Sequence, residues 1–401
     1  MTLDYFDKLL KQPSLFKDES KLDIDYLPEK LPHREKELQL LSQLFLQLLK
    51  KPNSISRKIL ITGKTGIGKS VTVKLFCKLL KDAASKRDII IKTVHVNCRK
   101  ERTSYKALIN IIRSLNENFP KRGYSPQDLL DIIVEFLEKE DIHLLIILDE
   151  LNYLINNKED LIYSLTRIND DTFNSPQRIS IIGIVRNISC LHNLDKSTMS
   201  TLQKNIIFFR NYSKEEIFDI LKYRISISLN SDVITNELIE QISKIIYEKG
   251  DIRYGLNIIW RSAKIAENKH LKHITSECIR LSVEDVFPFS ILDCLKTMSF
   301  QKLIFLYSII KTLQLNLKNK SYFSEIQANY KSICENIGIA SKSNSQLWNY
   351  LQEMKREGIL LISVQSEEIK GRRSVIEIPE ISLYKLEENL LYLLKEKGVQ
   401  I

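Results

Sequence analysis

The sequence predicts an α/β fold: a P-loop core with a parallel sheet and a helical lid, followed by a C-terminal winged-helix domain. Up to about residue 209, near-continuous apolar runs alternate with stretches of helical periodicity, which is typical of parallel strands buried on both faces. Residues 63–70 form a complete phosphate-loop motif between the first run and the helix after it. Beyond residue 290, three helical stretches precede two β-like segments joined by a charged turn, which is the winged-helix order.

The length indicates several domains, because 401 residues exceed the size of an ordinary single core. We divide the chain into an N-terminal arm (1–28), a P-loop domain (29–210), a helical lid (211–289) and a winged-helix domain (290–401), with Pro288 at the last boundary.

The composition is globular, with 43% hydrophobic and 27% charged residues. Apolar runs such as 144–148 are far shorter than the ~20 residues of a membrane helix. The N-terminus lacks the apolar stretch of a signal peptide, so we expect a cytoplasmic chain with no membrane partner. The six cysteines lack metal-ligand spacing and are expected to be small core residues: Cys77, Cys98, Cys190, Cys278, Cys294 and Cys334.

The net charge of +10 permits a nucleic-acid partner, but the excess is spread out. From Ser290 onward there are 15 Lys and Arg against 12 Asp and Glu, a surplus of three, so the other seven positive charges lie upstream. A DNA site therefore has to be argued from local clusters.

The core elements follow in order along the chain. Helical spacing is found at 37–50, 71–80 and 105–115, and strand-like runs at 59–62, 95–97, 144–149 and 179–185. Another helix opens at Ser125, with Ser as N-cap and Pro126 at the first helical position. Strands that alternate with helices predict a parallel sheet.

The pattern becomes helical after residue 209. A capping box at 213–216 opens a helix to about residue 229, and further helices are expected at 235–248 and 252–268. In the last domain we expect helices at 300–313 and 325–336, a capping box at 343–346 before a helix to about residue 357, and β segments at 359–364 and 374–378.

The phosphate loop has the full spacing of its motif. Its glycines let backbone N–H groups wrap phosphates, and the helix that follows adds its positive dipole. Lys69 is expected to reach the β- and γ-phosphates of ATP or ADP, and Ser70 to ligate Mg²⁺. The predicted nucleotide-contacting residues here are Gly63, Lys64, Thr65, Gly66, Ile67, Gly68, Lys69, Ser70 and Val71.

Two acids, Asp149 and Glu150, directly follow the apolar run 144–148. At the carboxyl end of a parallel strand they are placed for metal coordination. Asp149 is expected to hold Mg²⁺, mostly through water, and Glu150 to polarise the attacking water as general base.

Two more residues follow the core strands and the lid. Asn187 comes shortly after the run 179–185 and is either a polar sensor that positions water against the γ-phosphate or a turn residue, since Asn favours turns. Arg253 stands at the start of a lid helix, where an arginine either is solvated or swings over the phosphates.

These motifs resemble those of the archaeal origin-recognition and helicase-loading initiators, AAA+ ATPases related to the largest eukaryotic origin-recognition subunit. The resemblance spans about residues 27–378. It is carried by five stretches: residues 31–35 (Leu-Pro-His-Arg-Glu), residues 96–99 with Thr103 and Tyr105, residues 148–154 around the two acids, residues 182–184 with Asn187, and residues 250–253 (Gly-Asp-Ile-Arg).

The resemblance implies roles for further residues. Pro32, His33 and Arg34 fall in the family's segment near the adenine. Tyr212 and Arg224 match lid positions that contact nucleotide. By the same resemblance Asn187 is the first sensor and Arg253 the second.

One departure concerns the arginine finger, which completes a neighbouring subunit's site in this family. Ser197 stands at that place. Because arginine fingers are worth about 10³- to 10⁵-fold in turnover, the chain is not expected to activate a neighbour in the usual way. Lys196 is a weak substitute, because a lysine ammonium is a point charge and cannot donate two parallel hydrogen bonds as the guanidinium of arginine does.

The third helix of the winged-helix domain is expected to enter the major groove of duplex DNA. Short polar donors crowd its start, suited to phosphates and base edges; the alternative is a simple N-cap cluster. They are Ser341, Lys342, Ser343, Asn344, Ser345 and Gln346. Lys370, Arg372 and Arg373 at the hairpin tip resemble the family's basic wing, or else guard a solvated edge.

Together these features predict an ATP-dependent DNA replication initiator with weak ATPase activity, which binds origin DNA and switches between ATP and ADP states. One alternative is a DNA-binding regulatory paralogue that holds nucleotide structurally. Another is a non-replicative AAA+ ATPase such as a transposition helper. Expected partners are duplex DNA, other initiator paralogues and the replicative helicase, with the protein associated with the nucleoid.

Overall fold

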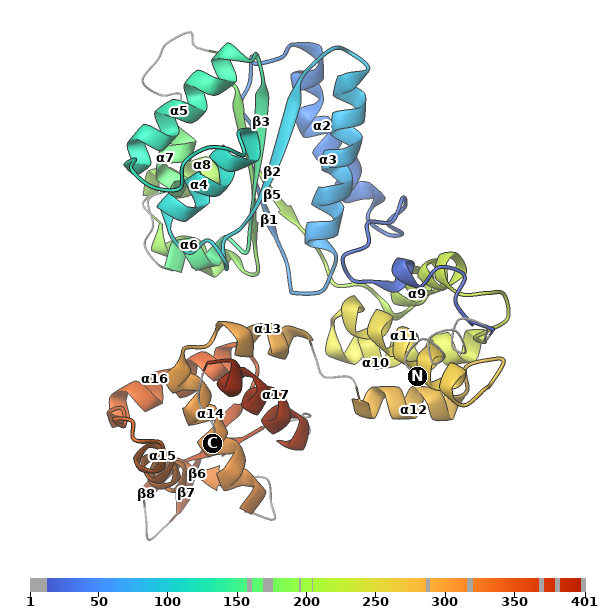
Figure 1. Ribbon diagram of the computed structural model, residues 1–401, viewed down its shortest axis with the longest axis vertical. Coiled ribbons are helices and arrows are strands. Elements are labelled where there is room, and N and C mark those ends of the chain that lie inside the picture. The colour runs from blue at the N-terminus through green and yellow to red at the C-terminus, as the bar shows by residue number, and fades with distance from the viewer. Residues whose placement is uncertain are drawn as a thin grey trace, which may run out of the picture. The chain divides into compact units, whose positions relative to one another are not determined.

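In the computed structural model the chain forms two compact units, Met1–Glu284 and Asp285–Ile401 (Figure 1). It describes residues 13–156, 161–168, 176–194, 196–203, 205–285, 289–315, 320–367, 371–378 and 383–397.

The first unit is built on a parallel sheet of five strands in the order β2-β3-β4-β1-β5. The strands are β1 (Lys58–Thr62), β2 (Ile91–Asn97), β3 (His143–Asp149), β4 (Ile179–Val185) and β5 (Ile206–Phe208). Every residue of β3 and β4 is buried, as expected for strands covered on both faces.

Helices cover both faces of this sheet (Figure 1). On one face lie α2 (Glu35–Lys50) and α3 (Lys69–Ser85). Their side chains pack with Leu145 and Ile147 of β3. The other face meets Leu144 and Ile146, so alternate residues of one strand serve two cores. On that face lie α4 (Ser104–Leu115), α5 (Pro126–Lys139), α7 (Leu161–Arg167) and α8 (Lys196–Gln203).

Short elements complete this domain at the carboxyl ends of the strands: α6 (Asn152–Asn156) after β3 and η2 (Ile188–Asn193) after β4. The strand ends are level with one another, because Thr62 pairs with Val185 and Asn97 with Asp149. Residues that follow these strands therefore gather at one edge of the sheet.

The lid is helical, as predicted. It consists of α9 (Lys214–Ser228), α10 (Asn236–Lys249), α11 (Ile252–Asn268) and α12 (Ser276–Asp285). The expected capping box between Ser213 and Glu216 is formed. The described part of the N-terminal arm contains a short helix, η1 (Glu19–Leu22), and Leu22 is buried. The arm lies along α9, where Phe16 forms a β-bridge with Leu229.

The second unit has the winged-helix order. Its helices are α13 (Phe289–Thr297), α14 (Phe300–Leu315), α15 (Phe323–Ile337), α16 (Asn344–Arg356) and α17 (Leu383–Glu396). Its antiparallel sheet has the order β6-β8-β7, with β6 (Lys320–Tyr322), β7 (Leu361–Glu367) and β8 (Gly371–Glu377). Helix α14 is buried almost all round and forms the centre of this core.

One local prediction was wrong. Ser343 is the N-cap of α16, but its side chain makes no capping hydrogen bond, so the predicted capping box is absent. The backbone starts the helix without it: Ser343 is extended (φ −66°, ψ 155°), and its carbonyl accepts from Leu347 N at 3.0 Å.

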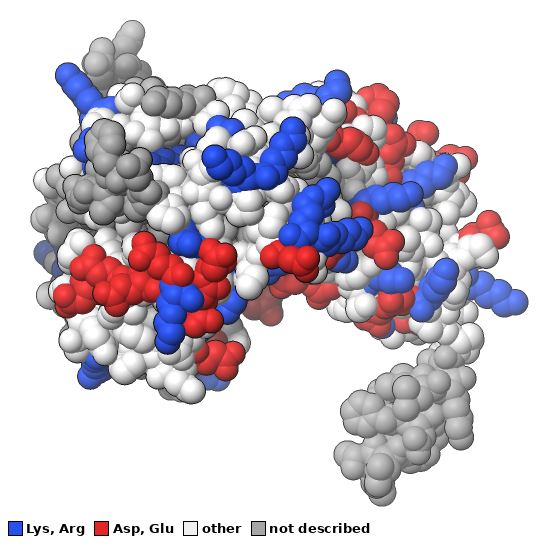
Figure 2. Space-filling model, turned by 90° about the horizontal axis from the view of Figure 1, so that it is seen from above, with Lys and Arg blue, Asp and Glu red and all other residues white. Residues whose placement is uncertain are grey.

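The distribution of charged side chains agrees with the expectation that the excess of positive charge is spread over the protein. On the face drawn in Figure 2, Lys and Arg form several separate groups, and acidic side chains gather in a band. Within the described residues, no helix is long and apolar enough to span a bilayer.

Candidate functional site

The phosphate loop lies between β1 and the start of α3, as the sequence predicts. Gly63, Gly66 and Gly68 have φ of 152°, 79° and 90°, a region that favours glycine. A Cβ on Gly66 would lie 2.3 Å from the carboxylate of Asp251, and one on Gly68 would lie 3.0 Å from the Tyr212 hydroxyl. Only glycine fits these positions, where the lid and the loop approach each other.

Lys69 is buried at the head of α3. Its Nζ donates hydrogen bonds to the carbonyl oxygens of Gly63 (2.5 Å) and Lys64 (2.6 Å). Burial lowers the pKa of Lys69 to about 8, with the positive charge of Arg186 acting in the same direction. The ammonium is thus held at the loop in a poorly solvated setting, where an added phosphate would be strongly attracted.

Asp149 and Glu150 stand at the end of β3. Asp149 Oδ1 accepts from Glu150 N at 2.8 Å, and its Oδ2 lies 3.5 Å from His95 Nε2 on β2. Glu150 adopts a left-handed backbone (φ 53°), a strained conformation for a non-glycine residue that recurs at functional sites. The two carboxylates therefore point in different directions from one strand end.

Two arginines meet the carboxylate of Glu150. Arg186 Nη2 donates to Oε1 at 2.9 Å, and Arg99 Nη1 lies 4.0 Å from Oε2. Neither arginine was predicted as a site residue. The position of Arg186 directly after β4 was a usable signal, but the sequence pointed to Asn187, one residue later.

Asn187 itself is the N-cap of η2. Its Oδ1 accepts from Ser189 N at 3.1 Å, which is the turn role that the sequence left open. Its role as first sensor stays a prediction.

The predicted second sensor, Arg253, is held by its neighbour. Its Nη2 lies 2.7 Å and its Nε 3.3 Å from Asp251 Oδ2. Asp251 also caps α11 by accepting from Arg253 N, and Ile252 N donates to Gly66 O at 3.2 Å. The start of α11 thus contacts the phosphate loop directly.

The predicted N-terminal motif reaches the same loop. Arg34 is 1% exposed, and its Nη2 donates to Ile67 O (2.8 Å) and Arg210 O (3.0 Å). Its guanidinium lies 4.0 Å from the centre of the Tyr212 ring. Arg34 therefore ties the motif to the loop and the lid.

Pro32 and His33 form a turn before Arg34. His33 has a left-handed backbone (φ 64°), and its Nε2 is 2.9 Å from Asp219 Oδ2. Burial raises the pKa of Tyr212 to about 12, so this residue contributes a neutral hydroxyl. These residues lie beside the loop, and their contact with the adenine stays a prediction.

Arg224 contacts the N-terminal arm. Its Nη2 donates to Lys21 O (2.6 Å) and Asp23 O (2.8 Å). The guanidinium thus fixes the N-terminal arm on the lid, and its contact with nucleotide stays a prediction.

Ser197 lies at the start of α8 and accepts a hydrogen bond from Arg167 Nη2, which comes from the end of α7. An arginine from elsewhere in the chain is therefore positioned at Ser197.

The donor set fits a magnesium–nucleotide complex. Within the residues that the structure describes, no group of three or more His, Cys, Asp or Glu side chains forms a metal site. Mg²⁺ bound with phosphates usually needs only one or two protein carboxylates. Ser70 at the head of α3 and Asp149 at the end of β3 have the expected chemistry and stand at the same edge of the sheet.

In the second unit, the residues at the start of α16 are exposed except for the half-buried Lys342. Lys342 N lies 3.4 Å from the buried Tyr330 hydroxyl, and Leu347, Leu351 and Met354 pack into the core. Ser341, Ser343, Asn344 and Gln346 are consequently displayed on the surface.

The predicted wing is a β7–β8 hairpin, in which Arg372 pairs with Ser366 and Arg373 with Gln365. The side chains of both arginines and the whole of Lys370 lie outside the described residues. Their predicted DNA contacts remain predictions.

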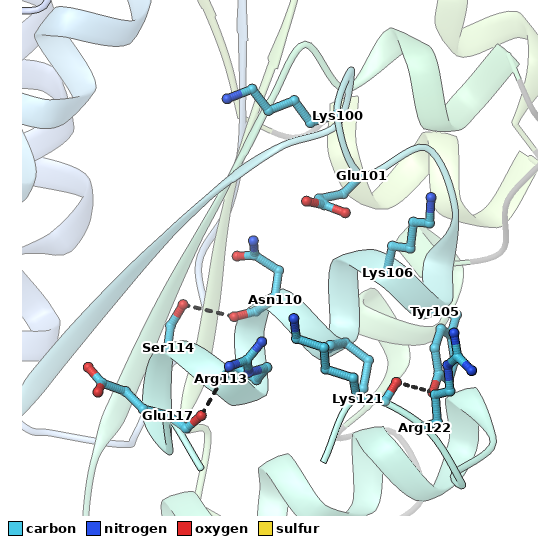
Figure 3. Close-up of a pocket in the computed structure, with 11 residues that line it drawn as sticks. Lys100, Glu101, Tyr105, Lys106, Asn110, Arg113, Ser114, Glu117, Lys121 and Arg122 are labelled. Atoms are coloured by element: carbon cyan, nitrogen blue, oxygen red, sulfur yellow. Dashed lines mark hydrogen bonds between the residues drawn. The ribbon is translucent and has the colours of Figure 1, made fainter. Parts of the chain in front are cut away.

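A separate cavity of about 840 Å³ lies over α4 and contains none of the phosphate-loop residues. Figure 3 shows Lys106, Arg113, Lys121 and Arg122 around it. The Tyr105 hydroxyl donates to Lys121 O at 2.9 Å and fixes one wall. Together with Lys100, these four make five basic residues that line the cavity, against two acidic ones, Glu101 and Glu117. This excess of positive charge favours the binding of anions.

Sequence models of three domains match the chain in this order: an AAA domain (residues 56–189), a Cdc6 AAA+ ATPase-type lid domain (218–284) and a CDC6 C-terminal winged helix domain (293–382). The chain is 31% identical over 390 residues to the ORC1-type DNA replication protein 2 of Sulfurisphaera tokodaii, covering 94% of this chain and 92% of the relative.

Two solved structures share the fold. The Aeropyrum pernix ORC1 protein, solved in complex with DNA, has a TM-score of 0.80 at 23% identity, over 94% of this chain and 97% of its own. Cdc6p from Pyrobaculum aerophilum has a TM-score of 0.57 at 28% identity, over 96% and 100%. The predicted core, lid and winged-helix domain are confirmed.

Proposed function

We propose, from the premise that this chain belongs to the Cdc6/ORC1-type family of AAA+ proteins, that it is a DNA replication initiator that binds origin duplex DNA and changes state with ATP or ADP. The observation that carries the proposal is the meeting of three elements: the phosphate loop, the acidic end of β3 and the start of lid helix α11. A nucleotide that contacts all three elements can shift the position of the lid when it changes from ATP to ADP.

The phosphate site supports binding of a nucleoside triphosphate with Mg²⁺. Lys69 would contact the β- and γ-phosphates, and Ser70 and Asp149 would hold the metal, which neutralises phosphate charge. In hydrolysis, a water oxygen bonds to the γ-phosphorus while the bond to the bridging oxygen breaks. Glu150 would accept the proton of that water. Arg253, which Asp251 holds at the start of α11, would contact the phosphates from the lid.

The winged-helix unit supports the DNA-binding part. Helix α16 displays Asn344 and Gln346 beside its N-terminus, and a hairpin with two arginines follows. Such a helix reads the major groove, and the hairpin contacts the backbone or minor groove. The S. tokodaii relative is a DNA replication protein by name, and the A. pernix protein was solved on DNA. The same proposal includes paralogous initiators and the replicative helicase as partners of the protein. It also places the protein in the cytoplasm, associated with the nucleoid.

The test maps where the protein sits on its own genome and compares those sites with the places where replication begins, found from DNA copy number. Peaks at replication start sites, lost in Lys69→Ala, support the initiator. In vitro, DNA affinity of the full chain is measured with ATP and with ADP. Identical affinities in both would contradict the switch, and peaks confined to promoters would contradict the initiator.

A second candidate is a regulatory paralogue that holds nucleotide structurally. The observation that favours it is Ser197 at the place of the finger arginine, with Arg167 bonded to it. A regulator would bind DNA with little hydrolysis in any assembly. An increase of hydrolysis on self-association that Arg167→Ala removes would favour the initiator instead.

A further inference from the structure

A histidine near the end of β2, His95, lies beside one of the two expected magnesium ligands. Its Nε2 is 3.5 Å from Oδ2 of Asp149. The side chain of His95 is 31% exposed, so an ion that arrives from solvent can reach the imidazole. None of the roles described above uses this side chain.

His95 also lies on the same face of the sheet as the other expected magnesium ligand, Ser70. Side chains alternate along a strand, and Ile147 of β3 faces the core that α2 and α3 cover. Asp149, two residues after Ile147, faces the same side, and so does His95, which pairs with Ile147. Ser70 stands on that side at the head of α3.

The first turns of α3 come close to the imidazole. Burial lowers the pKa of His95, and the positive charge of Lys74, one helical turn beyond Ser70, adds to that effect. The imidazole is therefore held in its neutral form beside Asp149. A neutral imidazole has a nitrogen lone pair and is a common metal ligand.

The spacing of the imidazole and the carboxylate suits two ligands of one cation. Ligand atoms about 2.1 Å from a metal lie about 3.0 Å apart in octahedral geometry and about 3.4 Å apart in tetrahedral geometry. The observed 3.5 Å between Nε2 and Oδ2 is close to these values. A small movement of either side chain brings both atoms into one coordination sphere.

We propose that His95 is a nitrogen ligand of the cation that binds with the nucleotide, so that this site prefers a divalent transition metal such as Co²⁺, Fe²⁺ or Zn²⁺ to Mg²⁺. Oxygen ligands suit Mg²⁺, whereas an imidazole nitrogen favours these metals. Asp149 then holds the ion directly and not through water, with oxygen from Ser70 and the phosphates. Mg²⁺ still binds, because the oxygen ligands remain. The inference rests on the proposed nucleotide function and names the class of metal at that site.

The test measures the affinity of the full chain for ADP by calorimetry, with Mg²⁺ and with Co²⁺, at about pH 8, where an imidazole is neutral. His95→Phe keeps a flat ring but removes the nitrogen. We expect it to lower the affinity with Co²⁺ about 10-fold or more and to leave the affinity with Mg²⁺ nearly unchanged. The matched control is His273→Phe, which removes an exposed histidine of the lid and should behave like the parent. Thermal unfolding checks that each variant is folded.

Proton NMR of the Co²⁺–ADP complex gives a second measurement, which a merely structural role of His95 would not change. Co²⁺ shifts the ring protons of a directly coordinated imidazole far outside the normal range of protein signals. We expect such signals in the parent and in His273→Phe, and their loss in His95→Phe.

The outcomes separate this inference from the proposed function. A parent-like ratio of the Co²⁺ and Mg²⁺ affinities in His95→Phe, or a parent without shifted imidazole signals, overturns the nitrogen ligand and leaves nucleotide binding intact. An equal loss of affinity with both metals would assign His95 to the shape of the site and would also overturn it. If His95→Phe does not fold, a parent-like ratio in His95→Gln overturns it. A parent chain that binds ADP with neither metal overturns the proposed function instead.

Discussion

The amide nitrogen of Ile252 donates a hydrogen bond of 3.2 Å to the carbonyl oxygen of Gly66, so the lid joins the phosphate loop through the backbone. The adjacent Asp251 fills the space beside Gly66 that a Cβ would need. The lid contact and the loop conformation are therefore one structural unit. A change at Gly66 has to disturb both.

Gly66→Ala should show how much the contact between Asp251 and the phosphate loop contributes, apart from the strain of an alanine at positive φ. The new Cβ would lie 2.3 Å from Asp251, an overlap that costs about 1–3 kcal/mol in addition to the positive φ. The matched control is Gly338→Ala, because Gly338 has a similar φ of 72° and open space around it. We expect Gly66→Ala to lower the free energy of unfolding more than the control and to weaken nucleotide binding, both measured by thermal unfolding with and without ADP. Equal losses in the two variants would contradict a tight lid contact.

Nucleotide affinity should fall as the pH rises through about 8. Phosphate binds the protonated ammonium of Lys69, whose pKa burial has lowered to about 8. Below that pH the charge is present before binding, so affinity is full. Above it, binding has to take up a proton, and affinity should fall by up to about tenfold per pH unit.

The measurement is calorimetric titration with ADP from pH 7 to about 9.5, where the phosphates stay ionised, as their pKa is near 6. Proton uptake is read from buffers of different ionisation enthalpy. Constant affinity over this range would show that Lys69 keeps an ordinary pKa.

Arg224→Ala should affect the N-terminal arm. The guanidinium is buried and donates part-buried hydrogen bonds to the carbonyls of Lys21 and Asp23, so its loss removes these bonds and leaves a gap where the guanidinium was. We expect unfolding to become easier by about 2–4 kcal/mol and proteolysis before residue 28 to become faster. Lys222→Ala, an exposed change on the same helix, is the control. A fall in nucleotide affinity without loss of stability would instead favour the nucleotide contact that the sequence predicted.

Much of the fold was readable because its signals are local. The apolar runs ending at Asp149 and Val185 became β3 and β4, and the phosphate loop lies where the strand–loop–helix order predicts. Strand β5 was missed because it has only three residues. Its apolar run, 206–209, is too short to be told from a piece of helix by its pattern. Helices α12 and α17 lay beyond the motifs that guided the prediction.

The contacts around the site were less predictable, since they join distant residues. Arg34 was expected beside the adenine. Its observed partners are Glu37, three residues on, and the carbonyls of Ile67 and Arg210, and no spacing rule connects these two carbonyls to it. The contact between Arg186 and Glu150 depends on where β4 ends and on the turn after it. A shift of one residue decides whether an arginine or an asparagine faces Glu150.

Substitutions in the wing and in α16 should have different effects on the binding of DNA by the full chain. Phosphate contacts carry affinity for any sequence and make it salt-dependent, whereas base contacts carry preference. Arg372→Ala with Arg373→Ala should weaken binding to specific and random duplexes alike, and flatten the salt dependence by about one unit of slope per lost phosphate contact. Asn344→Ala or Gln346→Ala should erode the preference for the specific site by about 1–3 kcal/mol per lost base contact.

The control for the wing is Lys395→Ala with Lys397→Ala, which removes two exposed positive charges at the end of α17 in the same unit. Salt titrations of each variant on a specific and a random duplex give both quantities. If the α17 variant loses as much affinity as the wing variant, net charge and not the hairpin governs binding. If neither Asn344→Ala nor Gln346→Ala changes the ratio between the two duplexes, these polar residues do not read bases. Their exposed cluster then serves only the start of α16.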